Sequence, residues 1–215
     1  MGLLRRLFCV LAGWLSCCAC FAQGVSIGVV GGVRTTDDMG GVGTISVSER
    51  YLVGPALGLG LGHRFGVEVD GLYRREGFDA AHTILNEYNL SITEHANSWE
   101  FPALVRYRLP FVVAKPFVEA GYALRFIHGQ MTTTEAYLTH ALISQVTSKT
   151  AWPASDGVVA GAGVDLELGH LRLSPTLRYT RWVHGGISGT YADGTTWGSA
   201  ANQLDLVVEI AWKSR

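Results

Sequence analysis

Histidine is the residue in this chain that most readily supplies acid–base or metal chemistry. The chain has seven: His63, His82, His95, His128, His140, His170 and His184. We expect all of them at turns or in loops, and no two stand at the spacing of metal ligands. The chain also contains no Walker-type phosphate loop, no GxSxG and no HExxH. These residues predict neither a metal site nor a cofactor.

Arginines and carboxylates are the other residues that could do chemistry, and they recur at alternate positions. The set comprises Arg34, Glu68, Asp70, Arg74, Glu100, Arg106, Arg108, Glu119, Arg125, Asp165, Glu167, Arg172, Arg178, Asp205 and Glu209. It contains no lysine. The planar guanidinium pairs two-to-two with a carboxylate and suits an enclosed face, whereas a solvated face, the alternative, normally mixes in lysine. We therefore expect an interior filled by Arg–carboxylate pairs, and a filled interior does not conduct.

The segments that carry these charges alternate between apolar and polar or glycine residues with a period of two, which is typical of β-strands. They are Val25–Arg34, Ile45–Gly62, Phe65–Arg74, Trp99–Leu109, Pro116–Ile127, Val158–Leu168, Leu171–Tyr179 and Gln203–Trp212. Most are near the 9–11 residues that a tilted strand needs to cross a bilayer. No stretch after the N-terminal segment is apolar enough for a transmembrane helix.

The connections alternate between short and long. Those at 63–64, 110–115 and 169–170 are short, and those at about 35–44, 75–98, 128–157 and 180–202 are long. Outer-membrane barrels have short periplasmic turns and longer extracellular loops. The pattern predicts an all-β, eight-stranded antiparallel up-and-down transmembrane β-barrel with both termini periplasmic. Segments 82–95 and 131–148 continue the alternation in places, so we expect them to project as hairpins.

Aromatic residues indicate which face of the barrel is the outside. On the apolar face they fall near the two strand ends, as the aromatic belts of a membrane barrel do. The belt residues are Tyr51, Tyr73, Trp99, Phe126 and Tyr179 at the long-loop end, and Phe65, Tyr107 and Trp212 at the short-turn end. Glycines on the polar face would leave room for the arginines opposite. A soluble, lipocalin-like barrel with the faces exchanged is the alternative.

The N-terminal segment has the order of an export signal. Arg5 and Arg6 precede an apolar run, and Cys20-Phe21-Ala22 resembles a cleavage site. We predict a signal peptide over 1–22 and a barrel domain over 23–215; an uncleaved anchor, or an acyl anchor at Cys17, is the alternative. All four cysteines lie in the signal, and charged residues are only 16% of the chain. The net charge of −1, without a basic run, excludes a nucleic-acid partner.

These features resemble the small barrels of the outer-membrane-protein-A transmembrane-domain superfamily, over the whole mature chain. The resemblance implies outer-membrane lipid as a partner. It also implies recognition of the C-terminal strand, which ends Ile210-Ala211-Trp212, by the barrel-assembly machinery. Val207 stands where that signal often has glycine, and three residues follow the aromatic residue. No peptidoglycan-binding domain follows, so a wall-anchoring role is not implied.

A structural or surface-interaction role, with a protein or surface ligand at the long loops, is the function that we expect. Exposed strand edges there would suit strand addition by another chain. Some relatives in such families are enzymes that modify lipid A or cleave surface peptides, and here His184 with Ser188, or His128 with Glu135, would be the candidate pairs. A small channel is a further alternative.

Overall fold

The computed structural model describes residues 22–41, 43–62, 64–84, 88–110, 114–137, 142–190, 194 and 196–213. Its described elements are all β-strands: β1 (Ala22–Arg34), β2 (Met39–Gly41), β3 (Thr44–Ser46), β4 (Tyr51–Leu61), β5 (Phe65–Asp70), β6 (Leu72–Ile84), β7 (Tyr88–Arg108), β8 (Lys115–Tyr137), β9 (Leu142–Ala151), β10 (Ser155–Leu168), β11 (Leu171–His184), β12 (Ser188–Thr190), β13 (Thr196–Ser199) and β14 (Asn202–Lys213). The described residues contain no helix with the length and hydropathy to span a membrane. The predicted export signal, except Ala22, lies outside them.

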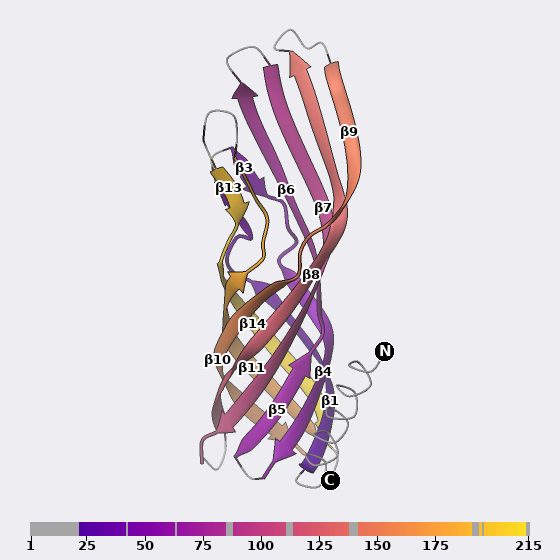
Figure 1. The fold of residues 1–215 in the computed structure, drawn as a ribbon. Coiled ribbons are helices and arrows are strands. Elements are labelled where there is room, and N and C mark those ends of the chain that lie inside the picture. The colour runs from indigo at the N-terminus through magenta and orange to yellow at the C-terminus, as the bar shows by residue number, and fades with distance from the viewer. Residues whose placement is uncertain are drawn as a thin grey trace, which may run out of the picture.

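Eight barrel strands close into an antiparallel up-and-down barrel, which confirms the predicted fold (Figure 1). Each strand pairs with its neighbours in sequence, in the order β1, β4, β5 with β6, β7, β8, β10, β11 and β14. The ring closes where β14 pairs antiparallel with β1, from Ser26 opposite Lys213 to Arg34 opposite Asp205. Ala22 and Lys213 therefore lie at the end of the barrel that carries the short turns.

The strand over Phe65–Arg74 is interrupted in the structure. β5 and β6 form one barrel strand that breaks at Gly71, and both parts pair with β4 and with β7. The Gly71 amide donates a hydrogen bond to the Pro55 carbonyl across the break, at 2.9 Å. A Cβ on the facing Gly54 would stand 1.7 Å from the Gly71 oxygen. The backbones approach so closely that only glycine fits at Gly54.

Alternation along each strand sorts the side chains into an enclosed face and an outer wall. On β8, the side chains of Phe117, Glu119 and Arg125 are buried, whereas Val118 and Phe126 are exposed. Because successive side chains of a strand point to opposite faces, the arginines and carboxylates gather inside and the aliphatic residues outside. The structure therefore has the reverse of the polarity of a soluble protein.

Much of the sequence predicted as long loops is folded into strands. β6, β7 and β8 continue past the barrel and form, together with β9, a projecting sheet that rises above the rest of the molecule in Figure 1. Tyr88 of β7 still pairs with Tyr137 of β8 at the far end of that sheet. The hairpins expected at 82–95 and 131–148 are therefore present, and they are joined side by side.

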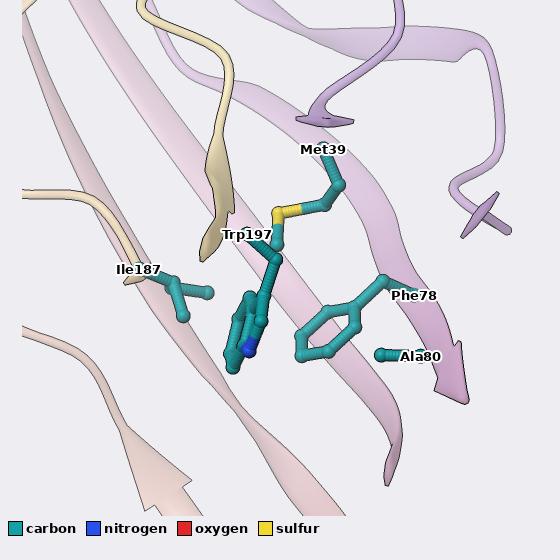
Figure 2. Packing of buried hydrophobic residues seen from close by; sticks show 5 residues of the cluster. All are labelled: Met39, Phe78, Ala80, Ile187 and Trp197. Carbon is teal, nitrogen blue, oxygen red and sulfur yellow. The ribbon is translucent and has the colours of Figure 1, made fainter. Parts of the chain in front are cut away.

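A small three-stranded sheet of β12, β13 and β2 lies opposite the projecting sheet, over the long-loop end of the barrel (Figure 1). Met39 of β2, Trp197 of β13 and Ile187, which precedes β12, pack against Phe78 and Ala80 of β6, as Figure 2 shows. The ring centroids of Phe78 and Trp197 are 4.9 Å apart. This apolar cap covers the barrel interior from the long-loop side.

Candidate functional site

The interior charges form two groups, of which the first surrounds Arg34 near the long-loop end. The Arg34 guanidinium binds Asp205 through Nε at 2.7 Å and Glu100 through Nη2 at 3.0 Å. Its Nη1 donates to Asp38 at 3.2 Å. Arg74 reaches the other Asp38 oxygen at 2.6 Å. Four strands of the barrel and the loop after β1 are thus tied together through two buried guanidinium groups.

The second group surrounds Arg106, nearer the short-turn end. Arg106 lies within 3.6 Å of four carboxylates on four other strand segments: Glu68, Glu119, Asp165 and Glu209. It also stacks on the ring of Phe117, with its Cζ 4.0 Å from the ring centroid. The four carboxylates compensate the charge of this buried guanidinium, which would be costly if it were unpaired.

The remaining arginines extend the second group. Arg178 bridges Asp70 at 2.8 Å and Glu119 at 2.9 Å. Arg172 contacts Glu209 at 2.5 Å. Arg108 binds Asp165 at 2.6 Å and is the least buried of the arginines in the group. Every carboxylate of this group is thus shared with at least one arginine.

Two of the predicted interior residues lie in different surroundings from the others. Arg125 lies against the Trp182 ring, 4.3 Å from its centroid, and its only recorded ion pair among the described residues is Glu76, at 3.9 Å. Glu167, which we expected inside the charge network, is exposed at the short-turn mouth and binds Lys115 at 2.6 Å. Glu167 is exposed because it lies near the end of β10, where the interior opens before the turn.

Three further buried carboxylates belong to the long-loop side of the interior: Asp38, Glu76 and Glu94. They lie in segments predicted as loops and are therefore absent from the predicted set of interior charges. Glu76 and Glu94 nevertheless keep the parity of Arg74 and Glu100 on the same strands. Extending the alternation past the predicted strand ends would have found both of them.

The surroundings of Glu76 and Glu94 shift the pKa values of the two carboxyl groups in opposite directions. Burial alone would raise the pKa of Glu76, but the charges of Arg125 and Arg74 outweigh it and lower the pKa from 4.5 to about 2. Burial raises the pKa of Glu94 above its usual 4.5. Hydrogen bonds from Trp152 Nε1, at 2.5 Å, and Thr150 only partly oppose that shift.

Two glycines make room for bulky interior side chains. A Cβ on Gly161 would lie 2.9 Å from Glu119 Oε1, and one on Gly163 would lie 2.6 Å from the Phe117 ring. The predicted role of interior glycines was to leave space for arginines. At these two positions the space is taken by a carboxylate and a ring.

The interior is filled except at the short-turn mouth. A cavity of about 290 Å³ opens at the short-turn mouth, lined by Arg108, Lys115 and Glu167 among others. The second charge group lines the inner end of this cavity, and the arginine side chains of both groups other than Arg108 are at most 5% exposed. A cavity of about 10 Å³ separates the Arg125 region from the apolar cap. The charges and the cap together leave no wide passage among the described residues.

The aromatic belt residues lie on the outer wall. Near the long-loop end, Tyr73 and Trp99 are register partners with ring centroids 5.2 Å apart, and Trp99 also pairs with Phe126. Tyr51 and Tyr179 are exposed at the corresponding ends of β4 and β11. Near the short turns, Phe65 pairs with Tyr107 at 5.0 Å, and Trp212 stacks on His170 at 5.3 Å.

The described residues contain no group of three or more histidine, cysteine, aspartate or glutamate side chains that could hold a metal ion. His95, His128 and His184 lie on strands rather than in loops, which corrects the prediction, as does His82. His63 and His140 fall outside the described residues. His128 and Glu135 lie seven residues apart on opposite faces of β8, so about 23 Å separates them along the strand. The Nδ1 atom of His184 lies 3.0 Å from Asp156 Oδ2, a partner that we did not predict.

The known proteins that match this chain resemble it in structure and not in sequence. No protein-family model matches the chain, and no curated protein matches it in sequence. The outer membrane protein OprG of Pseudomonas aeruginosa is similar in structure, with a TM-score of 0.55 and 12% identity over 90% of this chain and 97% of that one. The N-terminal barrel domain of OprF from the same organism aligns with a TM-score of 0.46 and 13% identity, over 90% and 98%. The attachment invasion locus protein Ail of Yersinia pestis aligns at 0.40 and 12%, over 89% and 97%. The likeness to OprG shows a shared fold, that of a small outer-membrane barrel.

Proposed function

We propose that the chain is an integral protein of the bacterial outer membrane, with the long-loop end extracellular and both termini periplasmic. The observation that carries the proposal is the polarity of the barrel. Large aliphatic side chains are exposed around the outer wall, for example Ile27 at 63%, Leu57 at 56% and Ile210 at 55%. The arginines of the interior are buried, for example Arg34, Arg106 and Arg178. A wall of exposed aliphatic residues between two aromatic belts fits lipid.

The polarity also argues against the soluble, lipocalin-like alternative. Such a barrel would keep its aliphatic side chains inside and its charges in water. Fractionation of cells, with gel mobility before and after boiling, tests the proposal. We expect the chain in the outer-membrane fraction with a mobility that changes on boiling. Recovery as a soluble periplasmic protein of fixed mobility would contradict it.

We infer that the barrel has a structural or surface-interaction role and is neither a pore nor an enzyme. The filled interior supports the absence of conduction, and the separation of His128 from Glu135 removes one of the two candidate catalytic pairs. Planar-bilayer conductance and a lipid A modification assay on refolded protein test both exclusions. Silence in both is expected. Conductance steps would favour the small channel, and altered lipid A would favour the enzyme.

The projecting sheet is the surface that best suits an interaction with another chain. β9 ends that sheet, and among the described residues no strand pairs with its outer edge. An open strand edge presents unpaired N–H and C=O groups that an extended peptide can bind.

The barrel-assembly machinery would recognise β14, because that strand carries the C-terminal aromatic pattern. Exchange of Trp212 for alanine is expected to lower assembly into the outer membrane.

A further inference from the structure

A set of exposed polar side chains lies on the outer face of the projecting sheet, directly beyond the aromatic belt. We call it the outward polar patch, and its members are Arg75, His95, Asn97, His128, Gln130 and Lys149. Strand register arranges the patch in rows. Tyr73, Trp99 and Phe126 form the belt row. Two residues further along the strands, Arg75, Asn97 and His128 form the next row.

The second row of the patch contains His95, Gln130 and Lys149, which are register partners on β7, β8 and β9. The belt is joined to the patch by a hydrogen bond from the Tyr73 hydroxyl to Asn97 Oδ1, at 2.7 Å. The patch is therefore a continuous surface of hydrogen-bonding groups over four strands, and it begins at the aromatic rings.

The first row of the patch lies at the height of the headgroup layer. At about 3.4 Å per residue, its two rows lie about 7 and 14 Å along the strand beyond the belt, or about 5 and 10 Å in height for a strand tilt of about 40°. The headgroup layer extends about 5–7 Å beyond each side of the hydrocarbon core. The first row then falls inside the headgroup layer, and the second lies a few ångströms beyond it, on the extracellular side.

The patch is hollowed in two places that share His95 and Asn97. One groove of about 410 Å³ includes Arg75 and Glu49 in its lining. The other, of about 390 Å³, includes His128, Gln130 and Lys149. Arg75 and Lys149 supply positive charge at the two ends, with Glu49 as the acid beside Arg75 and Asp79 one row beyond the patch. Amide, imidazole and threonine groups between the cations offer hydrogen bonds to hydroxyls.

We propose that the outward polar patch binds the phosphorylated saccharide headgroup of an outer-leaflet glycolipid. The two cations would bind phosphate, and Asn97 and Gln130 would bind sugar hydroxyls, while the acyl chains lie on the aliphatic wall below Trp99. Basic groups at the membrane surface recognise anionic headgroups in this way. This inference rests on the proposed membrane location and goes beyond it by naming a ligand class and its residues.

The test uses the full chain refolded in detergent, with binding of lipid A measured by native mass spectrometry. The probes are bisphosphorylated lipid A and the same lipid without phosphate. We expect tighter binding of the phosphorylated lipid, and a loss of roughly thirtyfold in the double variant Arg75→Gln/Lys149→Gln, because each cation at a membrane surface contributes roughly fivefold. Millimolar inorganic phosphate should not displace the lipid, since the site is built for a headgroup anchored in the membrane.

Two further variants serve as controls. The double variant Arg64→Gln/Lys115→Gln removes two cations from the short-turn rim and should bind like the wild type. The charge-preserving Arg75→Lys/Lys149→Arg should retain most of the binding. Equal affinity for the two lipids, or an undiminished affinity of Arg75→Gln/Lys149→Gln, would overturn the inference while leaving the proposed function intact. A chain that never shows a boiling-dependent mobility shift would overturn the membrane location and, with it, the inference.

Discussion

Arg34 and Asp205 form a two-bond ion pair across the seam where the first and last barrel strands meet. Nε of Arg34 lies 2.7 Å from Oδ1 and Nη2 lies 3.0 Å from Oδ2, and the two residues are also register partners of β1 and β14. The pair is buried, with side chains 0% and 3% exposed. A buried bidentate pair at the seam fixes the register in which the barrel closes.

Replacement of Arg34 by glutamine is expected to destabilise the barrel strongly. It leaves Asp205, Glu100 and Asp38 without their shared cation, and loss of one partner of a buried pair costs about 3–5 kcal/mol. Chemical denaturation in detergent measures the change. Arg50→Gln is the matched control, because its pair with Asp37 is exposed and worth about 0–1 kcal/mol. Equal losses in the two variants would contradict the assignment of stability to the enclosed network.

Glu119→Ala and Arg125→Ala are both expected to lower the temperature at which the barrel loses its folded gel mobility. Glu119 receives hydrogen bonds from Arg106 and Arg178, so its removal leaves two guanidinium groups undercompensated. Arg125 loses its contact with Trp182 and its attraction to Glu76. The larger decrease is expected for Glu119→Ala. Unchanged melting of both variants would rule out a stabilising charged core.

The lowered pKa of Glu76 should make the stability of the fold depend on pH. Its pKa of about 2 lies below the 4.5 of the unfolded chain, so the ionised carboxylate stabilises the fold fully above pH 4.5. That contribution is lost as the pH falls from 4.5 towards 2. Glu76→Gln should therefore be less stable than the wild type at pH 7, and the difference should shrink over that window. A difference independent of pH would show that the pKa of Glu76 is not depressed.

Trp197→Ala should loosen the apolar cap without opening the barrel. Trp197 is buried against Phe78 and Ile187, and its truncation removes the largest side chain of that cluster. Limited proteolysis is expected to cut 188–199 faster, while the boiling-dependent mobility shift is kept. Val146→Ala, at a residue 59% exposed, is the control and should be cut at the wild-type rate. An unchanged cleavage rate for Trp197→Ala would contradict the role of the cap.

The barrel could be predicted because its two faces differ in chemistry. Val118 and Glu119 are neighbours in sequence but face lipid-like and enclosed surroundings, so a period of two is visible along β8. The same contrast is weak in the projecting sheet. Thr132 and Thr133 are neighbours there with the same side chain on opposite faces, so the sequence alternates only in places and predicts a hairpin without its bounds.

Contacts between loops could not be predicted from periodicity. Met39 and Trp197 belong to distant segments and meet only because β2 pairs with β13. Glu167 has the parity of an interior residue, but parity does not report that the barrel mouth is open to solvent there. The outward polar patch could not be predicted from the sequence either, because its residues come together only when β7, β8 and β9 pair in register.

Gel mobility of the outer-membrane fraction, before and after boiling, tests most directly whether the charged face is enclosed and the aliphatic face meets lipid. The predicted result is that the full chain sediments with outer membranes and migrates differently when unboiled, as a folded barrel does. A soluble periplasmic chain with the same mobility before and after boiling would contradict the membrane barrel. The assignment of the charged face to the inside and the aliphatic face to the outside would then be wrong.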